Sequence, residues 1–412
     1  MKNCIYPIIF LCLAACDQGA EDNNSNRKAT PYAPLELSTV QQSMADANTT
    51  SSLNLFKEVA AEKPTENLFL SPISASYALN MTANGAAGNT LTEMRNVLGL
   101  DGYKQNGVND FYRKLTTYLQ EADGETILGL ANSIWVRTGY PVQSDFINVN
   151  KDNYAAEVRT ADFNSTTLKA INQWVNDKTY GHIPNMLDKI SENDVMYLIN
   201  ALYFDGVWKV PFTTTPNKDF TNQDGSQSKV NMLTGDKRSD PYYADDDLQM
   251  VQLNYGNGTY SMVLLLPNDD PTLQKTTALL TAENWKKWTM GANYSVKVNV
   301  KFPKLDLSYE QTLDEPLKML GMKDAFAPNQ ANFANLATSN NFCISKVLQK
   351  TTLKVDEKGT TATASTVVIG MDTSAGPDFS ETVDFIVDKP FLYAIKENST
   401  QTILFIGSVK KL

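Results

Sequence analysis

Histidine is almost absent from the 412-residue chain, which contains only His182. This scarcity excludes most catalytic and metal-binding arrangements. A Ser-His-Asp or Cys-His site needs a positioned imidazole, and the common zinc sites need several His or Cys ligands. His182 stands between Gly181 and the Ile183-Pro184 pair, in a sequence typical of a turn. We therefore predict that the protein is not an enzyme of these classes and has neither a metal site nor a cofactor.

Cysteine is also scarce, and three of the four cysteines lie in the first 16 residues. Lys2 and a short apolar run lead into Leu13–Cys16, which matches the cleavage box of a bacterial lipoprotein. The run is too short to cross a bilayer of about 30 Å. These features predict a signal peptide over residues 1–15 and a lipid on Cys16 that anchors the protein to a membrane. The alternative is an ordinary secretory signal with Cys16 present by chance.

The polar residues that follow predict a lipidated cysteine and flexible tether over residues 16–37. Acidic residues close to the lipid resemble the surface-export signals of some bacterial lipoproteins: Asp17, Glu21 and Asp22. We predict an extracytoplasmic cell-envelope lipoprotein of the outer membrane, displayed at the surface. Cys343 is then the only remaining thiol, so no intrachain disulfide can form. Its place in the alternating run Phe342–Leu348 predicts a buried structural thiol.

Positive charge is in the minority, and the formal net charge is −10. An acidic surface disfavours nonspecific binding to nucleic acid, so we predict no nucleic-acid partner.

Asp245–Asp247 lacks the spacing of a calcium loop and predicts a solvated acidic loop. Gly85–Thr90 lacks the lysine of a phosphate-binding loop and predicts a helix end. No repeat or Pro- or Gly-rich linker interrupts residues 50–412, so residues 38–412 are predicted to form one domain.

Apolar periodicity predicts helices and strands mixed without strict alternation, which indicates an α+β fold with large antiparallel or mixed sheets. Ser71 is the predicted N-cap of the helix that Pro72 begins. Trp285 and Trp288 indicate one buried helix face. Helices are predicted over residues 36–62, 72–84, 90–98, 166–180 and 313–320. Strands are predicted over residues 67–71, 127–136, 195–204, 248–255, 260–266, 296–302, 391–395 and 402–409, with a hairpin turn at Gly256–Gly258.

The segment Val355–Gly370 combines strand character with unusually small side chains. After Lys358 it carries no charge until Asp372, and its Thr and Val residues favour an extended backbone. One face of the alternation consists of residues small enough to be buried between two existing strands: Thr360, Ala362, Ala364, Thr366, Val368 and Gly370. A polar stretch follows that predicts an exposed loop. The segment is therefore suited to form a strand within a sheet, but it continues into a loop at the surface.

Several ordered motifs resemble those of the serpin family over essentially all of residues 38–412. They are Asn67–Ser74, Gly85–Thr90, Ile171–Val175 with Thr179–Pro184, Asn200–Trp208, Asp388–Leu392 and Phe405–Gly407. The resemblance implies a serpin fold, with a large central mixed β-sheet, two further sheets, about nine helices and an exposed reactive-centre loop. It also implies that Glu357–Ser365 is the hinge of that loop, with Glu357, Gly359, Thr360, Ala362, Ala364 and Thr366 as its key residues.

The resemblance further implies a suicide inhibitor of serine, and also of cysteine, endopeptidases. The protease attacks the loop, and the cut loop inserts into the central sheet with the protease still attached as an acyl-enzyme. A buried charge or a proline on the inserting face would oppose this step, and Thr360, Ala362, Ala364 and Thr366 present neither. The sequence therefore favours an inhibitory member, acting as a monomer on elastase-like, subtilisin-like or broad-specificity proteases.

The position of the cut bond depends on how the loop is counted. Counting from Glu357 with the family's usual loop length gives Thr373 and Ser374 as the reactive bond. Counting back from Lys389 gives a site near Phe379. Met371 and Asp372 are further alternatives.

The family's shutter and breach, which control opening of the central sheet, map onto Ser71, Ser74, Asn200, Trp208 and Gln349. Many members have a histidine where this chain has Gln349, and Gln349 is expected to hydrogen-bond with Asn200 and Ser71. The basic heparin-binding helix of some members has no counterpart here, so no glycosaminoglycan cofactor is expected.

Two other functions remain open at this stage. A non-inhibitory serpin would use the same fold as a binding module. A hydrolytic or glycan-binding surface lipoprotein would need catalytic ligands or an exposed aromatic platform, and neither is recognisable in the sequence.

Overall fold

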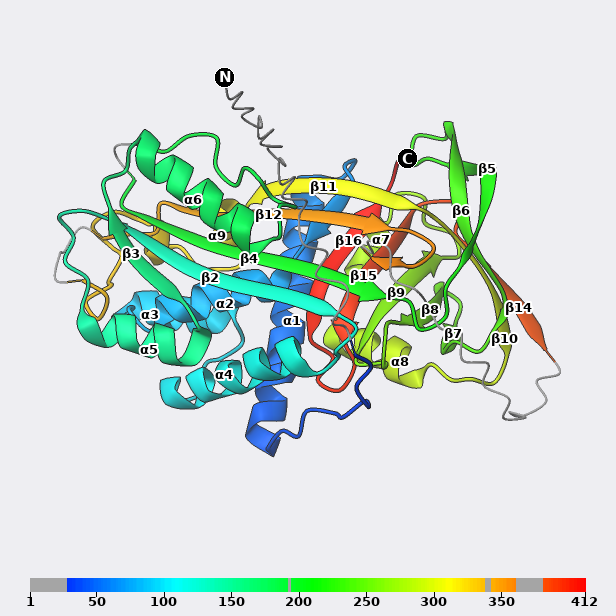
Figure 1. The fold of residues 1–412 in the computed structure, drawn as a ribbon, viewed down its shortest axis with the longest axis horizontal. Coiled ribbons are helices and arrows are strands. Elements are labelled where there is room, and N and C mark those ends of the chain that lie inside the picture. The colour runs from blue at the N-terminus through cyan, green and yellow to red at the C-terminus, as the bar shows by residue number, and fades with distance from the viewer. Residues whose placement is uncertain (1–27, 192–193, 338–341, 361–380) are drawn as a thin grey trace, which may run out of the picture.

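The computed structural model describes residues 28–191, 194–337, 342–360 and 381–412. Its six-stranded central sheet has the order β11-β12-β13-β4-β2-β3 (Figure 1). The long middle strands β2 and β4 are antiparallel in a continuous register from Ile127↔Asp205 to Val136↔Met196. The strands are β2 (Ile127–Arg137), β3 (Glu157–Ala161), β4 (Met196–Val207), β11 (Leu305–Thr312), β12 (Lys346–Val355) and β13 (Gly359–Thr360).

A second six-stranded sheet forms the centre of the hydrophobic core. Every residue of β9, β15 and β16 is buried, which explains why their sequences are apolar without alternation. Positive φ angles at Gly256 and Gly258 allow the predicted turn between β8 and β9. In sheet order the strands are β1 (Leu68–Leu70), β16 (Ile403–Val409), β15 (Phe391–Glu397), β9 (Tyr260–Pro267), β8 (Leu248–Asn254) and β7 (Tyr242–Ala244).

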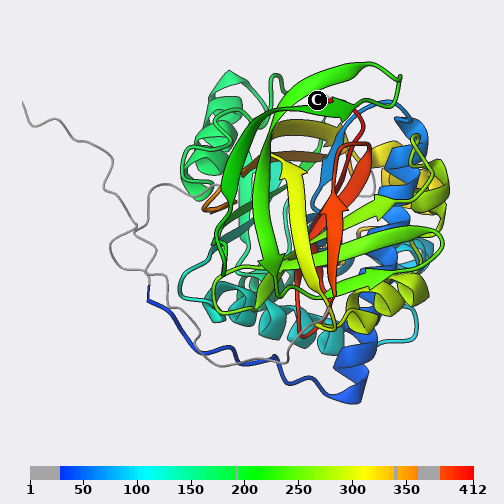
Figure 2. The same cartoon turned by 90° about the vertical axis from the view of Figure 1, so that its right-hand side faces the viewer.

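A third, four-stranded sheet lies at one end of the molecule (Figures 1 and 2). Its strands in order are β14 (Thr382–Ile386), β10 (Lys297–Pro303), β6 (Gln227–Arg238) and β5 (Thr213–Thr221). β5 follows β4 in the chain, and β14 lies beyond the segment after β13. The chain thus lies in the central sheet, in β13, before the predicted reactive loop and in the third sheet, in β14, after it.

Nine α-helices and a 3₁₀ turn, Asp324–Phe326, are present in the described part of the chain. All residues of α2 are buried because it runs between sheets, in contact with both β4 and β16. None of the described helices is long and apolar enough to span a bilayer. The helices are α1 (Thr39–Glu62), α2 (Pro72–Ala83), α3 (Gly88–Val97), α4 (Gln105–Glu121), α5 (Ser144–Tyr154), α6 (Ser165–Lys178), α7 (Gln274–Ala278), α8 (Ala282–Gly291) and α9 (Asp314–Met319).

The predicted helices and strands are present with shifted ends, but three local predictions need correction. Ser71 does occupy the N-cap position of α2, yet its hydroxyl makes no capping bond and donates instead to the Leu404 carbonyl at 2.8 Å. Cys343 is half-buried, between the buried Phe342 and Ile344, and it precedes β12 rather than lying in a strand; partial burial raises the pKa of its thiol. The helices α4, α5 and α7 were not predicted.

The last part of the predicted tether lies against the domain. The Tyr118 hydroxyl donates to the Ala33 carbonyl at 3.0 Å, and the Leu35 N–H donates to the Ser399 hydroxyl at 3.1 Å. Leu35 also packs against the main core. This differs from the expectation of a flexible tether through residue 37, because a tether with polar anchors and an apolar contact is fixed to the surface.

Replacing Phe69 with alanine should strongly destabilise the domain. Phe69 is 1 % exposed and its ring lies 5.0 Å from that of Phe405. A cavity at this position should lower the unfolding free energy, measured by denaturant titration, by about 3–5 kcal/mol. The control Met319→Ala, at a side chain that is 75 % exposed, should change it by less than about 0.5 kcal/mol. Equal effects of the two substitutions would contradict this description of the core.

Candidate functional site

The strands β12 and β4 of the central sheet pair with each other only at one end. β12 and β4 are parallel from Lys346↔Tyr197 to Leu348↔Ile199. Beyond this point the register of β4 continues with β2, and the register of β12 continues with β11. We call the place between residues 200–205 of β4 and 349–354 of β12 the acceptor position, because a further strand there could pair on both sides.

The strand β13 already stands at the head of the acceptor position. It is antiparallel to both neighbours, with Thr360 opposite Val355 of β12 and opposite Gly206 of β4. A tight turn after β12 directs it there, in which the Asp356 N–H donates to the Gly359 carbonyl at 2.9 Å. The chain therefore enters the sheet in the direction that a longer inserted strand would follow.

Thr360 has the burial that the sequence alternation predicts for an inserting residue. It is 1 % exposed, and its hydroxyl lies 2.6 Å from the hydroxyl of Tyr255. The other predicted residues of this face and of the reactive bond lie outside the described residues: Ala362, Ala364, Thr366, Met371, Asp372, Thr373, Ser374 and Phe379.

Two residues of the segment after β4, Trp208 and Phe212, hold the turn by donating hydrogen bonds to its backbone carbonyls. The indole N–H of Trp208 donates to the Asp356 carbonyl at 2.9 Å, and its backbone N–H donates to the Lys358 carbonyl at 2.8 Å. The Phe212 N–H donates to the intervening Glu357 carbonyl at 2.9 Å. Three consecutive carbonyls of the hinge are thus bound, and the Trp208 ring is stacked on Tyr255 with centroids 4.2 Å apart.

Buried polar side chains connect α2 to the two strands that flank the acceptor position. Gln349 of β12 accepts from the Ser71 N–H at 2.8 Å and donates to the Ser71 carbonyl at 2.7 Å. On the β4 side, Asn200 accepts from the Ser74 hydroxyl. β12 is therefore tied to Ser71, at the N-cap position of α2, and β4 is tied to Ser74, in its first turn.

One expected contact differs. Gln349 does bond to Ser71, but the side-chain partners of Asn200 are Ser74 and, on β2, Asn132. Gln349 lies on β12 and Asn200 on β4, just past the last residue pair between these strands, Leu348↔Ile199. The two amides therefore do not bond to each other: Gln349 bonds to Ser71 at the start of α2, and Asn200 bonds to Ser74 of α2 and to Asn132 of β2.

Comparisons with known proteins identify the family to which this chain is related. The model of the serpin (serine protease inhibitor) family matches residues 46–412. The chain belongs to the serpin family. It is 32 % identical to the leukocyte elastase inhibitor of Sus scrofa, over 89 % of this chain and 98 % of that one, and 31 % identical to the glia-derived nexin of Homo sapiens, over 90 % and 94 %.

Solved serpin structures have the same fold. The thermophilic serpin tengpin in its native state aligns with a TM-score of 0.82 at 33 % identity, covering 93 % of this chain and 97 % of that one. Human thyroxine-binding globulin complexed with thyroxine aligns with a TM-score of 0.80 at 25 % identity, over 90 % and 99 %. The predicted serpin fold is confirmed, with three sheets and a central mixed sheet.

An ion pair that sequence reasoning missed fixes the hinge of this serpin. Lys304, between β10 and β11, contacts the Glu357 carboxylate at 2.6 Å, and the Thr214 hydroxyl donates to the same oxygen. Desolvation favours the protonated acid, but the hydrogen bonds from Lys304 and Thr214 outweigh it and lower the pKa of Glu357 to about 2. Lys304 stands in no periodic pattern, so only the fold reveals its partner.

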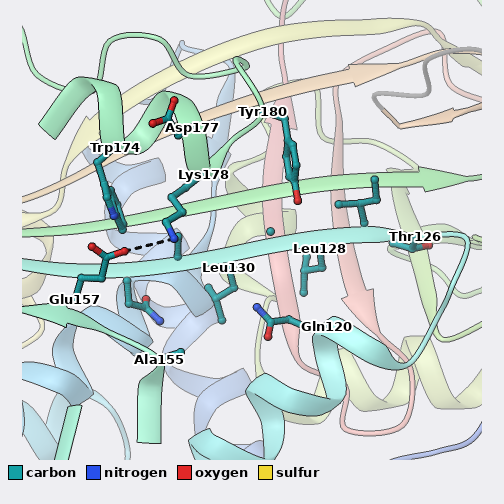
Figure 3. Close-up of a pocket in the computed structure, with 14 residues that line it drawn as sticks. Gln120, Thr126, Leu128, Leu130, Ala155, Glu157, Trp174, Asp177, Lys178 and Tyr180 are labelled. Carbon is teal, nitrogen blue, oxygen red and sulfur yellow. Dashed lines mark ion pairs between the residues drawn. The ribbon is translucent and has the colours of Figure 1, made fainter. Parts of the chain in front are cut away.

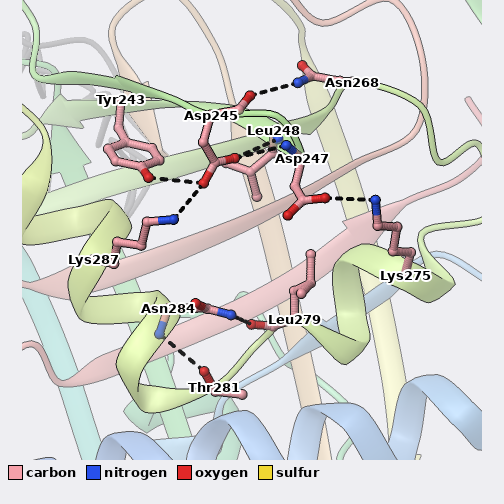
Figure 4. A network of polar contacts seen from close by, with 10 residues as sticks. All are labelled: Tyr243, Asp245, Asp247, Leu248, Asn268, Lys275, Leu279, Thr281, Asn284 and Lys287. Carbon is pink, nitrogen blue, oxygen red and sulfur yellow. Dashed lines mark hydrogen bonds and ion pairs between the residues drawn. The ribbon is translucent and has the colours of Figure 1, made fainter.

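Other candidate residues have structural partners. The His182 ring is stacked on Tyr203 with centroids 4.7 Å apart, and burial lowers its pKa. In the acidic loop, Asp245 contacts Lys287 at 3.0 Å and Asp247 contacts Lys275 at 2.7 Å (Figure 4). The loop is therefore neutralised by lysines of α7 and α8 rather than only solvated. No cluster of three potential metal ligands occurs within the described ranges.

An open cavity of about 540 Å³ lies against β2, beside the C-terminal end of α6 (Figure 3). Trp174 and the Glu157–Lys178 ion pair, at 3.4 Å, line one side. Leu128 and Leu130 of β2 line another. None of the residues that line it belongs to β4, β12 or β13, so the cavity is separate from the acceptor position and the hinge.

Replacing Gly359 with alanine should expel β13 from the sheet. A Cβ atom there would lie 2.0 Å from the Gly206 carbonyl oxygen, which belongs to the rigid backbone of β4. Amide hydrogen exchange at Thr360 should rise by at least about tenfold, as local pairing is lost. The control Gly107→Ala, whose nearest neighbour would be 3.7 Å away, should leave it unchanged. Unaltered exchange in Gly359→Ala would contradict the placement of β13.

The Glu357–Lys304 pair should make hinge stability depend on acid. Because the folded-state pKa of Glu357 is about 2 and its ordinary value is 4.5, the stabilisation is complete above about pH 4.5 and is lost as the pH falls toward 2. The ratio of the exchange rate at Gly359 to the intrinsic rate of an unprotected amide at the same pH should therefore rise on acidification in the natural protein and depend less on pH in Glu357→Gln. The variant Glu310→Gln, which removes a pair with Lys350 on the same sheet, is the control. Identical pH profiles for the natural protein and Glu357→Gln would show that the pair does not hold the hinge.

Proposed function

We propose that this serpin inhibits serine endopeptidases, and also cysteine endopeptidases, by inserting its cut loop into the acceptor position. The observation that carries the proposal is β13, which enters the sheet antiparallel to both neighbours with Thr360 buried. The inhibitors among its relatives support the same activity.

The reaction at the loop forms one covalent bond and breaks another. The protease nucleophile attacks the carbonyl of Thr373, and the Thr373–Ser374 peptide bond breaks with its amine leaving on Ser374. Thr373 then remains as an acyl-enzyme ester or thioester. Met371, Asp372 and Phe379 are alternative positions for the cut.

Insertion supplies the driving force for the trap. Residues 360–373 would make a strand of roughly 45 Å, long enough to carry the attached protease along the sheet. Roughly a dozen new hydrogen bonds, at about 1 kcal/mol each, would favour the inserted state by on the order of 10 kcal/mol. This gain is withheld until the bond is cut, because the intact loop is tied at both ends, to β13 and to β14.

We propose that lipidated Cys16 anchors the protein in the cell envelope of a bacterium, at the outer membrane and at its surface, where the inhibitor would meet foreign proteases. Contacts of Thr30, Ala33 and Leu35 with the domain support a short reach, because the first of these, from the Gly124 N–H to the Thr30 hydroxyl at 3.1 Å, leaves only residues 17–29 between the lipid and the domain. A monomeric state and the lack of a glycosaminoglycan cofactor stay predictions.

The trap should give a covalent complex that survives denaturing electrophoresis. The protein is mixed with a panel of elastase-like and subtilisin-like serine proteases and with cysteine proteases, and the released loop peptide is identified by mass spectrometry. Inhibition predicts a band at the summed mass with at least one of them. If every protease that cuts the loop releases only cleaved serpin, the protein is not an inhibitor of this type and the binding-module alternative stands.

The substitution Thr360→Arg should convert the inhibitor into a substrate. Thr360 already lies buried in β13 beside Tyr255, so arginine there would have to lose its hydration or keep β13 out of the sheet, and insertion could not begin from this strand. The fraction of cut molecules that remain attached to protease should fall by at least about tenfold, while the rate of loop cleavage is retained. The matched control Thr221→Arg, at an exposed end of β5, should inhibit normally. Normal trapping by Thr360→Arg would refute the assignment of the inserting face.

A further inference from the structure

A buried ion pair lies in the third sheet, next to the segment that holds the hinge. Arg238, the last residue of β6, contacts Asp240 with Nε 2.5 Å from Oδ2, and the two side chains are 5 % and 9 % exposed. Charged groups are buried this deeply only when paired and hydrogen-bonded, because they lose their hydration. Burial of this pair therefore requires further stabilising contacts, which an ion pair on the surface does not require.

The rest of the Arg238 guanidinium is directed at the segment between β4 and β5. Its Nη1 donates to the Val210 carbonyl at 3.0 Å. Its Cζ lies 4.1 Å from the centre of the Phe212 ring, a cation–π contact. Asp240 holds one edge of the guanidinium, so the other edge and one face are fixed against Val210 and Phe212.

Phe212 transmits this arrangement to the hinge. Its N–H donates to the Glu357 carbonyl at 2.9 Å, and its ring packs edge-on against Trp208, with centroids 5.6 Å apart. Trp208 in turn binds the carbonyls of Asp356 and Lys358. All three bound carbonyls of the hinge thus depend on residues that Arg238 contacts directly or through one aromatic ring.

We propose that Arg238 and Asp240 are positioning residues for loop insertion. They hold the Val210–Phe212 segment against the hinge and so set how readily β13 separates from β4 and β12 before the loop is cut. Neither residue touches the protease or the cut bond. The proposal that this timing governs inhibition rests on the proposed function, whereas the hold on the hinge itself does not.

The test compares Arg238→Met and Arg238→Lys with a matched control. Amide hydrogen exchange is measured on the uncleaved protein without any protease, at Lys358, Gly359 and Thr360 and in the helix α5, at the opposite end of the central sheet (Figure 1), as an internal reference. Arg238→Met should raise exchange at the three hinge amides by at least about tenfold over the reference. Arg238→Lys, which keeps the charge but loses the planar fork that serves both partners, should give a smaller rise.

The control Lys229→Met removes an exposed ion pair with Asp219, at 2.6 Å, on the neighbouring strands β5 and β6. It should leave the hinge unchanged. If Arg238→Met does not fold, Arg238→Lys alone decides. Hinge exchange within about twofold of the natural protein, or a rise shared equally by the reference helix α5, would overturn the proposal, since the pair would then be inert or generally structural.

A second readout links the pair to inhibition. When each variant reacts with a protease that the natural protein traps, the fraction of cut molecules that stay attached should be lower for the Arg238 variants than for Lys229→Met, because insertion begins from β13 and a loosened hinge delays it. An unchanged attached fraction despite faster hinge exchange would overturn the effect on insertion. If no protease is trapped even by the natural protein, the proposed function fails, while the exchange data still decide whether Arg238 holds the hinge.

Discussion

The ladder between β12 and β4, which stops after three residue pairs, is the constraint on which the rest of the structure depends. Two long strands lie at the centre of a six-stranded sheet, yet between Leu348 and the short β13 each pairs only with its outer neighbour among the described strands. A strand in this position could form hydrogen bonds on both sides. If the cut loop fills it, as we propose, the molecule reaches a more stable arrangement, and the contacts at the two ends of the acceptor position would control access to it.

Access is controlled at both ends of the acceptor position. At one end, Gln349 and Ser74 tie the two strands to the start of α2 through buried hydrogen bonds. At the other end, Trp208 and Phe212 bind the carbonyls of the hinge, and Lys304 neutralises Glu357 beside them. Because buried polar contacts of this kind form or break as sets, they would keep the sheet closed until the loop is cut, as the proposed function requires.

Local patterns predicted the parts of this site that depend on near neighbours in the sequence. The burial of Thr360 followed from alternation, and the glycine turn at residues 256–258 followed from turn chemistry. The contact of Gln349 with Ser71 followed only from resemblance to a family. The patterns missed Lys304 and Arg238, because their importance comes from partners that the fold brings together and not from periodicity. The docked residues Ala33 and Leu35 were missed for the same reason, since a polar stretch shows no sign of the surface that binds it.

The central claim is that the acceptor position takes up the cut loop, and thermal unfolding before and after loop cleavage tests it most directly. With the loop cut by a protease and the protease then removed, the account predicts a rise in the unfolding midpoint of about 10–20 °C, since the inserted strand adds on the order of 10 kcal/mol. A midpoint that stays the same or falls would show that the cut loop remains outside the sheet.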